Sequence, residues 1–511
     1  MANAANLLTK IVQLFRTPSV GPTAPRNLRV RNRYDAASQG RRLGVWMPGT
    51  PGPNASLIDL DLLRARSRDA TRNDGWIKKG INSWVSNEIG TGITPRSKAK
   101  DKDFRTAADA LWNRQVKVMD ADGVLDFYGQ QGLAARTRVE GGEIFVRIRQ
   151  RKPSDGLPVP FQLQVVEPEF CPATMNETAP NGNKVRKGIE FNAIGKRVAY
   201  WMYRTHPGDN LWNDFREMVR VPADSVLHHY APLRAGQLRG VPWTIQALIK
   251  ARDFSEYDDA ELVRKKTRSS YTAAIVRQAY DNDEFAFDPF TGNPLERDAN
   301  DSPVMTVESG SMVALLPGED LKFFEGDPAG AGYADFVRQQ LLGVAASLDI
   351  PYEFLTGDMS KVNDRIMRVI NNEFHRIVEQ TRWLLTVPQV CDPIWAFFIK
   401  QAILSGALEA PGYLKAPDDY LAVDWRPQRW EYLHPVQDVQ ARQMEVNAGF
   451  TSRSAVVAEG AESAEEVDEQ NAEDKNRAES LGLQYSTNQV VEVPADAPEP
   501  APAPEKGAAA A

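Results

Sequence analysis

The pair His228-His229 and the acidic run Asp258-Asp259-Glu261 are the groupings in this 511-residue sequence whose side chains could bind a metal ion. Adjacent residues of a strand point to opposite faces of the sheet, so the two imidazoles cannot hold one metal without distortion. Carboxylates suit Mg²⁺, but the acidic run falls in a stretch predicted to be helical, where a solvated charged face is the simpler interpretation. We therefore predict structural histidines and no metal site.

Motifs for other kinds of catalysis are absent from the sequence. It contains no phosphate-binding G-x-x-x-x-G-K-[ST] loop, no G-x-S-x-G nucleophile elbow, no G-x-G-x-x-G turn and no H-E-x-x-H pair. Cys171 and Cys391 lie far apart in the chain, which indicates two buried free thiols in a reducing compartment. His375 is predicted to be structural as well. These patterns predict a protein that is not an enzyme and uses no cofactor.

The charge balance argues against a tight nucleic-acid binder. The net charge is −7 and the isoelectric point about 5.6, whereas such proteins usually carry a basic face. A basic strand end (Arg147, Arg149, Arg151, Lys152) could contact phosphate, but a solvated strand edge is favoured. The N-terminal arginines 26, 29, 31, 33, 41 and 42 leave open a contact with DNA or an acidic partner. No apolar stretch is long enough for a membrane span, so a soluble protein is expected.

Hydrophobic periodicity predicts helices before and after a β-rich middle, and so an α+β fold. Helical spacing over 59–89, broken at 73–75, is followed by helices over 104–119 and 125–139. A period of two then predicts strands over 143–149, 161–166, 188–194, 198–204 and 226–230, with the third and fourth forming a hairpin. Helices return over 333–348, over 365–385, after Pro393 and within 435–483.

The most informative stretch is a predicted helix over 245–275 that contains neither Gly nor Pro and carries charges on several faces. Isolated buried charges are costly, so this helix should lie at the surface or pack against copies of itself in a ring. A loop- and strand-like excursion, 276–330, separates it from the helix over 333–348. An excursion carried on two long helices suits a protrusion better than an enzyme.

Several strings, in this order along the chain, resemble the lambda-type family of tailed-phage portal proteins. They are RARSRD at 64–69 with RN at 72–73, NEIGTGI at 87–93, HHYAPLRAGQLRGVPW at 228–243, ARDFSEYDDAELVRKK at 251–266, GSMVALLPGEDLKFFE at 310–325, IPYEFLTGDMS at 350–360, WRP at 425–427, GFTS at 449–452 and EG at 459–460. The resemblance runs from Tyr34 to Glu479. It departs from the family at 361–366, where KVNDRI replaces an Asn-Tyr-Ser-Ser-type run.

The resemblance implies a portal fold made of a β-rich wing, paired stem helices, a small α/β clip and a helical crown. Mapped onto this sequence, it implies a flexible arm (1–57), wing segments (58–245 and 350–430), stem helices (246–275 and 331–349), a clip (276–330), a crown (431–490) and a disordered tail (491–511). A loop at 357–364 would face a channel. Its possible DNA contacts are Asp358, Ser360, Lys361, Asn363, Asp364 and Arg365.

The function implied by the resemblance is a ring, typically of twelve subunits, at one capsid vertex. Double-stranded DNA would pass through it during packaging and ejection. The terminase large subunit and later the head–tail connector would dock at the clip, and the major capsid and scaffold proteins would surround the ring. The chain would belong to the virion, after assembly in the host cytoplasm. Alternatives are another head protein, such as a minor capsid or connector subunit, or a nucleic-acid enzyme of the packaging apparatus.

Ring symmetry gives the charges a role. Because every lumenal side chain is repeated around a ring, a strongly basic lumen would clamp DNA, whereas a mostly acidic one lets it slide. Lys361 and Arg365 are expected to make light contacts only. In the stem, charges are expected to pair between neighbouring subunits, each exposed pair contributing about 0–1 kcal/mol. These residues are Asp258, Asp259, Glu261, Arg264, Lys265, Lys266 and Arg268.

Overall fold

In the computed structural model of the protein, the chain divides into two units, 1–56 and 57–511. The structure describes residues 52–209, 217–270, 273–277, 296–297, 303–304, 319–323, 332–430, 434–460 and 463–483, with residues 267–323 described by their backbone alone. The predicted arm (1–57) lies almost entirely outside these residues, and the predicted tail (491–511) lies wholly outside them.

Two consecutive helices open the second unit, as predicted. They are α2 (Leu60–Asn73) and α3 (Gly75–Glu88). The break between them is capped by Asp74, whose side chain accepts hydrogen bonds from the backbone N–H groups of Trp76 (2.8 Å) and Ile77 (2.9 Å). Such a cap satisfies donors that have no partner within the helix, which explains why α3 begins here. The predicted helices that follow are also present, as α4 (Lys102–Gln115) and α5 (Phe127–Gly141).

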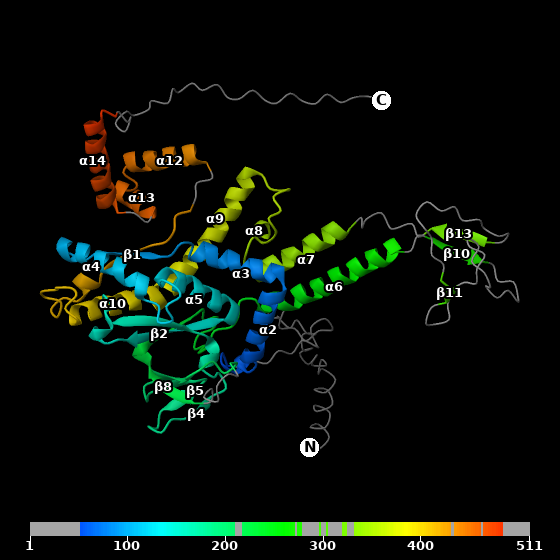
Figure 1. Cartoon of the computed structure of the whole chain (residues 1–511), viewed down its shortest axis with the longest axis horizontal. Coiled ribbons are helices and arrows are strands. Elements are labelled where there is room, and N and C mark those ends of the chain that lie inside the picture. Colours follow the sequence, from blue (N-terminus) through cyan, green and yellow to red (C-terminus); the bar gives the residue numbers. More distant parts are fainter. Residues whose placement is uncertain are drawn as a thin grey trace, which may run out of the picture. The chain divides into compact units, whose positions relative to one another are not determined.

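The β-rich middle consists of two antiparallel sheets (Figure 1). In the first, β2 (Glu143–Gln150) lies between β3 (Phe161–Val166) and β9 (Val226–Tyr230). The second has the order β4 (Asn176–Thr178), β5 (Lys184–Arg186), β6 (Ile189–Phe191), β7 (Arg197–Tyr203) and β8 (Met218–Pro222). Strands β6 and β7 are the predicted hairpin. Strands β4, β5 and β8 were not predicted.

The interpretation of the basic strand end was wrong in one respect. Strand β2 is central rather than an edge, because β3 and β9 pair with it on both sides. Two of its arginines also have protein partners: Arg149 donates to Gln164 (2.9 Å), and Arg151, just beyond the strand, donates to Gln162 (2.8 Å). These contacts lie across the β2–β3 pair, so the arginines stabilise the sheet.

The long charged helix is shorter than predicted. Helix α6 spans Ile245–Ser270 and ends there, and Ala273–Arg277 forms strand β10, which pairs with β13 (Glu319–Phe323). The prediction of one helix as far as 275 was therefore wrong, whereas the clip boundary at 276 stays a prediction. The β-branched Ile275 and Val276 favour a strand once a partner is available. Strands β11 (Glu296–Arg297) and β12 (Pro303–Val304) form another pair, and the second helix is α7 (Tyr333–Ser347).

The predicted break between the helix over 365–385 and the helix after Pro393 does not exist. Helix α9 (Asp364–Thr381) continues as a π-helical segment, Arg382–Cys391, into α10 (Asp392–Leu404). Pro388 lies inside the segment. Proline has no N–H and its ring clashes with the preceding turn of an α-helix, and wider π turns are one way in which a continuous helix accommodates such a local disruption.

The chain ends, within the described residues, in α12 (Pro435–Asn447), α13 (Arg453–Glu459) and α14 (Ala464–Leu481). Among these helices only Ala478 is buried. A short helix, α11 (Asp418–Leu421), precedes strand β14 (Val423–Arg426), which pairs with β1 (Thr94–Ser97). Strands β1 and β14 were not predicted, because each is short and its partner lies about 330 residues away in the sequence. No described helix is both long and apolar enough to cross a membrane.

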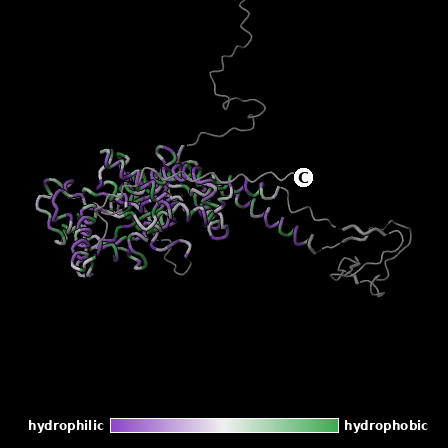
Figure 2. The backbone as a smooth tube through the Cα atoms, turned by 90° about the horizontal axis from the view of Figure 1, so that it is seen from above, coloured by the Kyte–Doolittle hydropathy of each residue, from purple (hydrophilic) through white to green (hydrophobic). Residues whose placement is uncertain are grey.

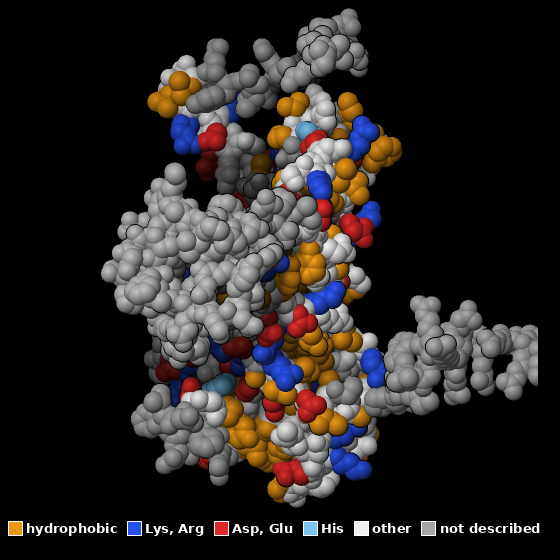
Figure 3. Space-filling view, turned by 90° about the vertical axis from the view of Figure 1, so that its right-hand side faces the viewer, with side chains coloured by type: hydrophobic (Ala, Val, Ile, Leu, Met, Phe, Trp, Pro, Cys, Tyr) orange, Lys and Arg blue, Asp and Glu red, His pale blue; other side chains and the backbone are white. Residues whose placement is uncertain are grey.

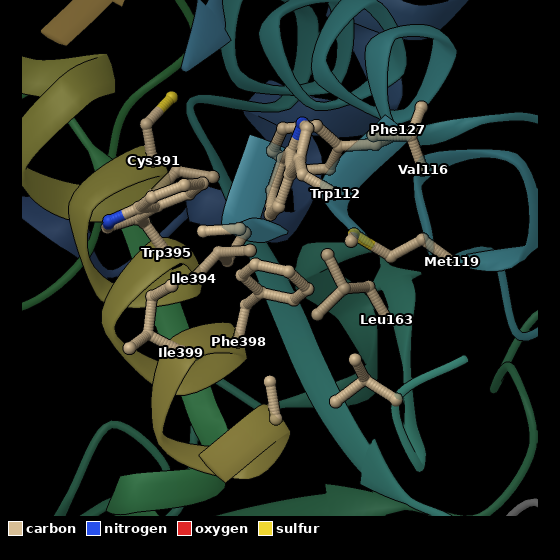
Figure 4. Close-up of a cluster of buried hydrophobic side chains, with 14 of the residues drawn as sticks. Trp112, Val116, Met119, Phe127, Leu163, Cys391, Ile394, Trp395, Phe398 and Ile399 are labelled. Carbon is tan, nitrogen blue, oxygen red and sulfur yellow. The ribbon is translucent and has the colours of Figure 1, made fainter. Parts of the chain in front are cut away.

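Three buried clusters hold the body of the second unit together. Figure 4 shows part of the largest, in which Trp112 of α4 meets Trp395 and Phe398 of α10 at ring-centroid distances of 5.4 and 5.0 Å. A second cluster joins α3, α6, α7 and α9, and a third lies between the two sheets. Hydrophobic and hydrophilic residues are interspersed along the backbone of the described chain (Figure 2). The clusters fix where α6 and α9 leave the body.

Candidate channel loop and stem contacts

The loop predicted to face a channel lies between two helices that define its ends. Helix α8 (Tyr352–Thr356) stops at Gly357, whose φ of 74° is in the left-handed region that favours glycine. At the other end, Asn363 caps α9 by accepting a hydrogen bond from the N–H of Ile366 (2.8 Å). The turn between them is therefore set by local sequence.

The first half of the loop is tied to α7 through Asp358. Its carboxylate accepts hydrogen bonds from Arg338 of α7 (3.2 Å) and from the N–H of Ser360 (3.0 Å), and Tyr352 lies 3.4 Å away. Hydrogen bonding from Ser360, with Arg338 nearby, lowers the pKa of Asp358. Asp358 therefore stays ionised, and its carboxylate orders the loop through these hydrogen bonds.

The second half is tied to the C-terminal helices. Asp364 lies 2.5 Å from Nε2 of His434, the residue that precedes α12. Lys361 and Arg365 are exposed and form no ion pair with another described residue. Two of the six predicted contact residues therefore present free cationic groups. Ser360 and Asn363 contribute loop geometry, and Asp358 and Asp364 hold the ends of the loop.

Helices α6 and α7 lie side by side and are joined by aromatic rings. The ring of Tyr257 lies 4.6 Å from that of Phe336, and the hydroxyl of Tyr333 hydrogen-bonds to Asp258. This hydrogen bond to a carboxylate raises the pKa of Tyr333 to about 12. The ammonium of Lys265 lies 4.5 Å from the centre of the Tyr333 ring. Two of the predicted stem residues, Asp258 and Lys265, thus have partners in their own chain.

The remaining predicted stem charges are distributed unevenly. Glu261 is 8% exposed and pairs with Arg264 (2.7 Å) and more distantly with Lys265 (3.9 Å). Asp259 and Lys266 are exposed, and the side chain of Arg268 lies outside the described residues. Pairing between subunits remains a prediction for the residues of this set, but part of their charge is already balanced within α6.

A buried carboxylate that the sequence analysis missed fixes the start of α6. Glu143 of β2 is fully buried and lies 2.5 Å from Arg64 of α2, 2.6 Å from Nε of Arg239 and 2.8 Å from His228. It also accepts a hydrogen bond from the N–H of Gly240 at 2.7 Å. Glu143 thus ties the loop that enters α6 to the sheet.

The charge state of this cluster follows from its partners. Burial alone would raise the pKa of Glu143, but the guanidinium groups of Arg239 and Arg64 hold it well below its ordinary value. Burial lowers the pKa of His228 to about 4, despite the neighbouring carboxylate. His228 is therefore neutral at pH 7, and Glu143 is ionised between two guanidinium groups.

A second buried carboxylate, Glu88 of α3, fixes the start of the π-helical segment. It pairs with Arg138 of α5 and accepts a hydrogen bond from Thr386 at 2.5 Å, while its backbone carbonyl accepts one from Arg382 at 2.6 Å. The sequence signal for both carboxylates was weak: Glu88 belongs to the string at 87–93, and Glu143 begins a strand of apolar residues. Their partners lie far away in the sequence.

The three histidines predicted to be structural contact protein side chains. His228 and His229 lie on opposite faces of β9: the first contacts Glu143, and the second lies 2.9 Å from Oε1 of Gln389 in the π-helical segment. His375 stacks on Trp430 at 3.7 Å. Both cysteines are buried free thiols.

One group of possible metal ligands was not predicted. Oxygen and nitrogen atoms of Glu167, Glu169 and His206 lie within 4.8 Å of one another. Arg68 already pairs with both carboxylates, at 3.3 and 2.9 Å. Its guanidinium supplies the positive charge that a cation would bring, so we interpret the group as an ion-pair network.

Known proteins resemble this chain in sequence. The family described as phage portal protein, lambda family, matches residues 39–382, more than half of the chain. The probable portal protein of Halomonas phage phiHAP-1 is 27% identical over 470 residues, covering 88% of this chain and 87% of that protein. Portal protein B of Escherichia phage lambda is 20% identical over 512 residues, covering 92% of this chain and 95% of that protein.

Solved structures give a weaker likeness. The neck of a native gene transfer agent particle, treated with C12 symmetry, aligns with a TM-score of 0.44 and 15% identity, covering 80% of this chain and 93% of that one. A virion structure of the same kind of particle aligns with a TM-score of 0.43 and 14% identity. The family match covers α2 to α9 and thus both sets of residues described above. This chain belongs to the lambda family of phage portal proteins and is a structural portal subunit.

Proposed function

We propose that copies of this chain form a ring, typically of twelve, that serves as the DNA channel at one vertex of a phage capsid. Membership of the portal family is the observation that carries this proposal. The helices α6 and α7 support it. They flank residues 271–332 and lie side by side, as expected of a stem that carries a clip at its end. The wing would comprise 58–245 and 350–430, the clip 276–330 and the crown 431–490, with α6 and α7 as the stem.

The loop at 357–364 would face the DNA. Its ends are held by Asp358 and Asp364, so Lys361 and Arg365 can reach phosphate while the loop keeps its place. DNA affinity rises with each phosphate that a cation neutralises, and a ring repeats each cation in every subunit. Two cations per subunit beside two carboxylates would give weak contacts, which suits DNA that slides in both directions.

The partners follow from the place in the capsid. The terminase large subunit would dock at the clip during packaging, and the head–tail connector would replace it afterwards. The major capsid and scaffold proteins would surround the ring, which would assemble in the host cytoplasm and remain in the virion. The chain would have no enzymatic activity of its own, and ATP turnover would belong to the terminase.

Complementation tests this proposal. A phage or prophage lacking the gene should make heads without DNA, and the full-length chain supplied in trans should restore filled heads. Normal filling without the chain would contradict the proposal and favour another head protein. Purified chain should show no ATP- or metal-dependent turnover on DNA; turnover that follows the chain through purification would favour the packaging enzyme.

A further inference from the structure

One face of α9 is exposed along its whole length although it carries large apolar side chains. The apolar members are Ile366 (46% exposed), Val369 (66%), Trp383 (44%) and Leu384 (63%), the last two just beyond α9 in the π-helical segment. The opposite face is buried through Phe374 and Val378. Single exposed apolar residues are common, but four along one helix face mark a surface that another element covers.

The outward face of α6 has the same character. Ile249 (74% exposed), Leu262 (50%) and Val263 (61%) lie among charged residues, while Ala247, Ala251 and Phe254 face the core. Hydrophobic side chains are interspersed with charged ones on the side toward which α6 and α7 run (Figure 3). Neither α6 nor α9 therefore buries its outward apolar residues within the described chain.

The charges left over on these two faces have opposite signs. On α6, Arg252 pairs with Glu256 at 3.0 Å, which leaves Asp253 and Asp259 without an ion pair to a described residue. On α9, Arg376 pairs with Glu373 at 3.5 Å, which leaves Arg365. The α6 face then carries one net negative charge, from Asp253, Glu256 and Asp259 against Arg252 and Lys266, and the α9 face carries one net positive charge, from Arg365 and Arg376 against Glu373.

Ring closure gives these faces a use. In a closed ring each subunit contacts its two neighbours through two different surfaces, so complementary faces must lie on the same chain. We propose that the outward face of α9 in one subunit packs against the acidic outward face of α6 in a second copy of this chain. This inference rests on the proposed ring, and it moves the subunit contact away from Asp258 and Glu261, whose partners lie within the chain.

Reciprocal charge reversal in the full-length chain tests the pairing. R365E/R376E makes the α9 face acidic, and D253K/D259K makes the α6 face basic. Each double variant should need at least about tenfold more protein to form rings than the wild type, because like charges then meet at each contact. The quadruple variant should recover ring formation, since the contact is again between opposite charges.

The apolar residues provide an independent test with a matched control. I366S/V369S should weaken ring formation, while V124S/I194S, which changes residues that are 82% and 85% exposed elsewhere, should not. Ring formation is read from particle mass against concentration. Circular dichroism and thermal unfolding at fixed concentration show that each chain is folded.

The outcomes separate this inference from the proposed ring. A wild-type chain that forms no rings would overturn both. Wild-type rings together with unaffected double variants, or a quadruple variant that stays as defective as the doubles, would overturn the α6–α9 contact and leave the ring intact. Defective doubles with a restored quadruple would support it, because a misfolded or DNA-related defect would not be restored by a second charge reversal.

Discussion

Replacing Glu143 by Gln should destabilise the body of the subunit more than any surface change. The carboxylate is fully buried and is contacted by Arg64, Arg239, His228 and the N–H of Gly240 at 2.5 to 2.8 Å. The variant keeps the size of the side chain but leaves two buried guanidinium groups without their counter-ion. Removing one partner of a buried ion pair costs about 3–5 kcal/mol, which raises the unfolding constant at least about a hundredfold.

The assay is chemical unfolding of the full-length chain at fixed protein concentration, because the stability of an oligomer depends on concentration. E466Q is the matched control: it removes the same kind of carboxylate from an exposed pair with Arg96 at 2.9 Å. We expect the control to change the free energy of unfolding by about 0–1 kcal/mol. A loss below about 1 kcal/mol for E143Q would refute the assignment of Glu143 as the anchor of the α6 entry.

Three further predictions follow from the geometry. K361A should change the rate of DNA packaging without changing ring formation, because Lys361 is exposed and is not part of the proposed α6–α9 contact; unchanged packaging would remove Lys361 from the DNA path. The free energy of unfolding should fall as the pH falls from about 6.5 towards 4. In this range the unfolded chain binds a proton at His228, whereas folded His228 stays neutral because its pKa is about 4. For this residue the free energy of unfolding should change by up to about 1.4 kcal/mol per pH unit. Unfolding free energies that stay flat over this range would contradict the neutral, buried His228. Salt near 1 M should accelerate hydrogen exchange in α14 more than in α10, since α14 contacts the body through Arg96–Glu466 and Arg105–Glu465 and buries only Ala478; equal protection of α14 in low and high salt would show that other contacts hold it.

The sequence correctly predicted those elements that are determined by interactions between residues close together in the chain. The break at Asp74, the strands β2, β3 and β9, and the helix α7 follow from caps and from apolar periodicity. The end of α6 was wrong because pairing of β10 with β13 is a non-local interaction that overrides helix propensity. The continuous path through Pro388 was missed because a proline ordinarily ends a helix.

The candidate site shows the same division. The loop over 357–364 was placed correctly between two helices, and its two exposed cations were identified. The anchors at Glu143 and Glu88 were not, because their partners lie up to about 300 residues away and no spacing rule connects them. The partners of Asp258 and Glu261 within the chain could not be inferred from the sequence either. Asp258 contacts Tyr333 only because α6 packs against α7, and Glu261 pairs with Arg264 of its own helix.

The mass and symmetry of the purified full-length particle test the central claim most directly. Twelve copies of the 56.9-kDa chain weigh about 680 kDa, so mass photometry together with electron-microscopic class averages should show rings near this mass with an open centre. Rings of eleven or thirteen subunits would still agree with a central channel. A chain that stays monomeric or dimeric at every salt and protein concentration would contradict the account.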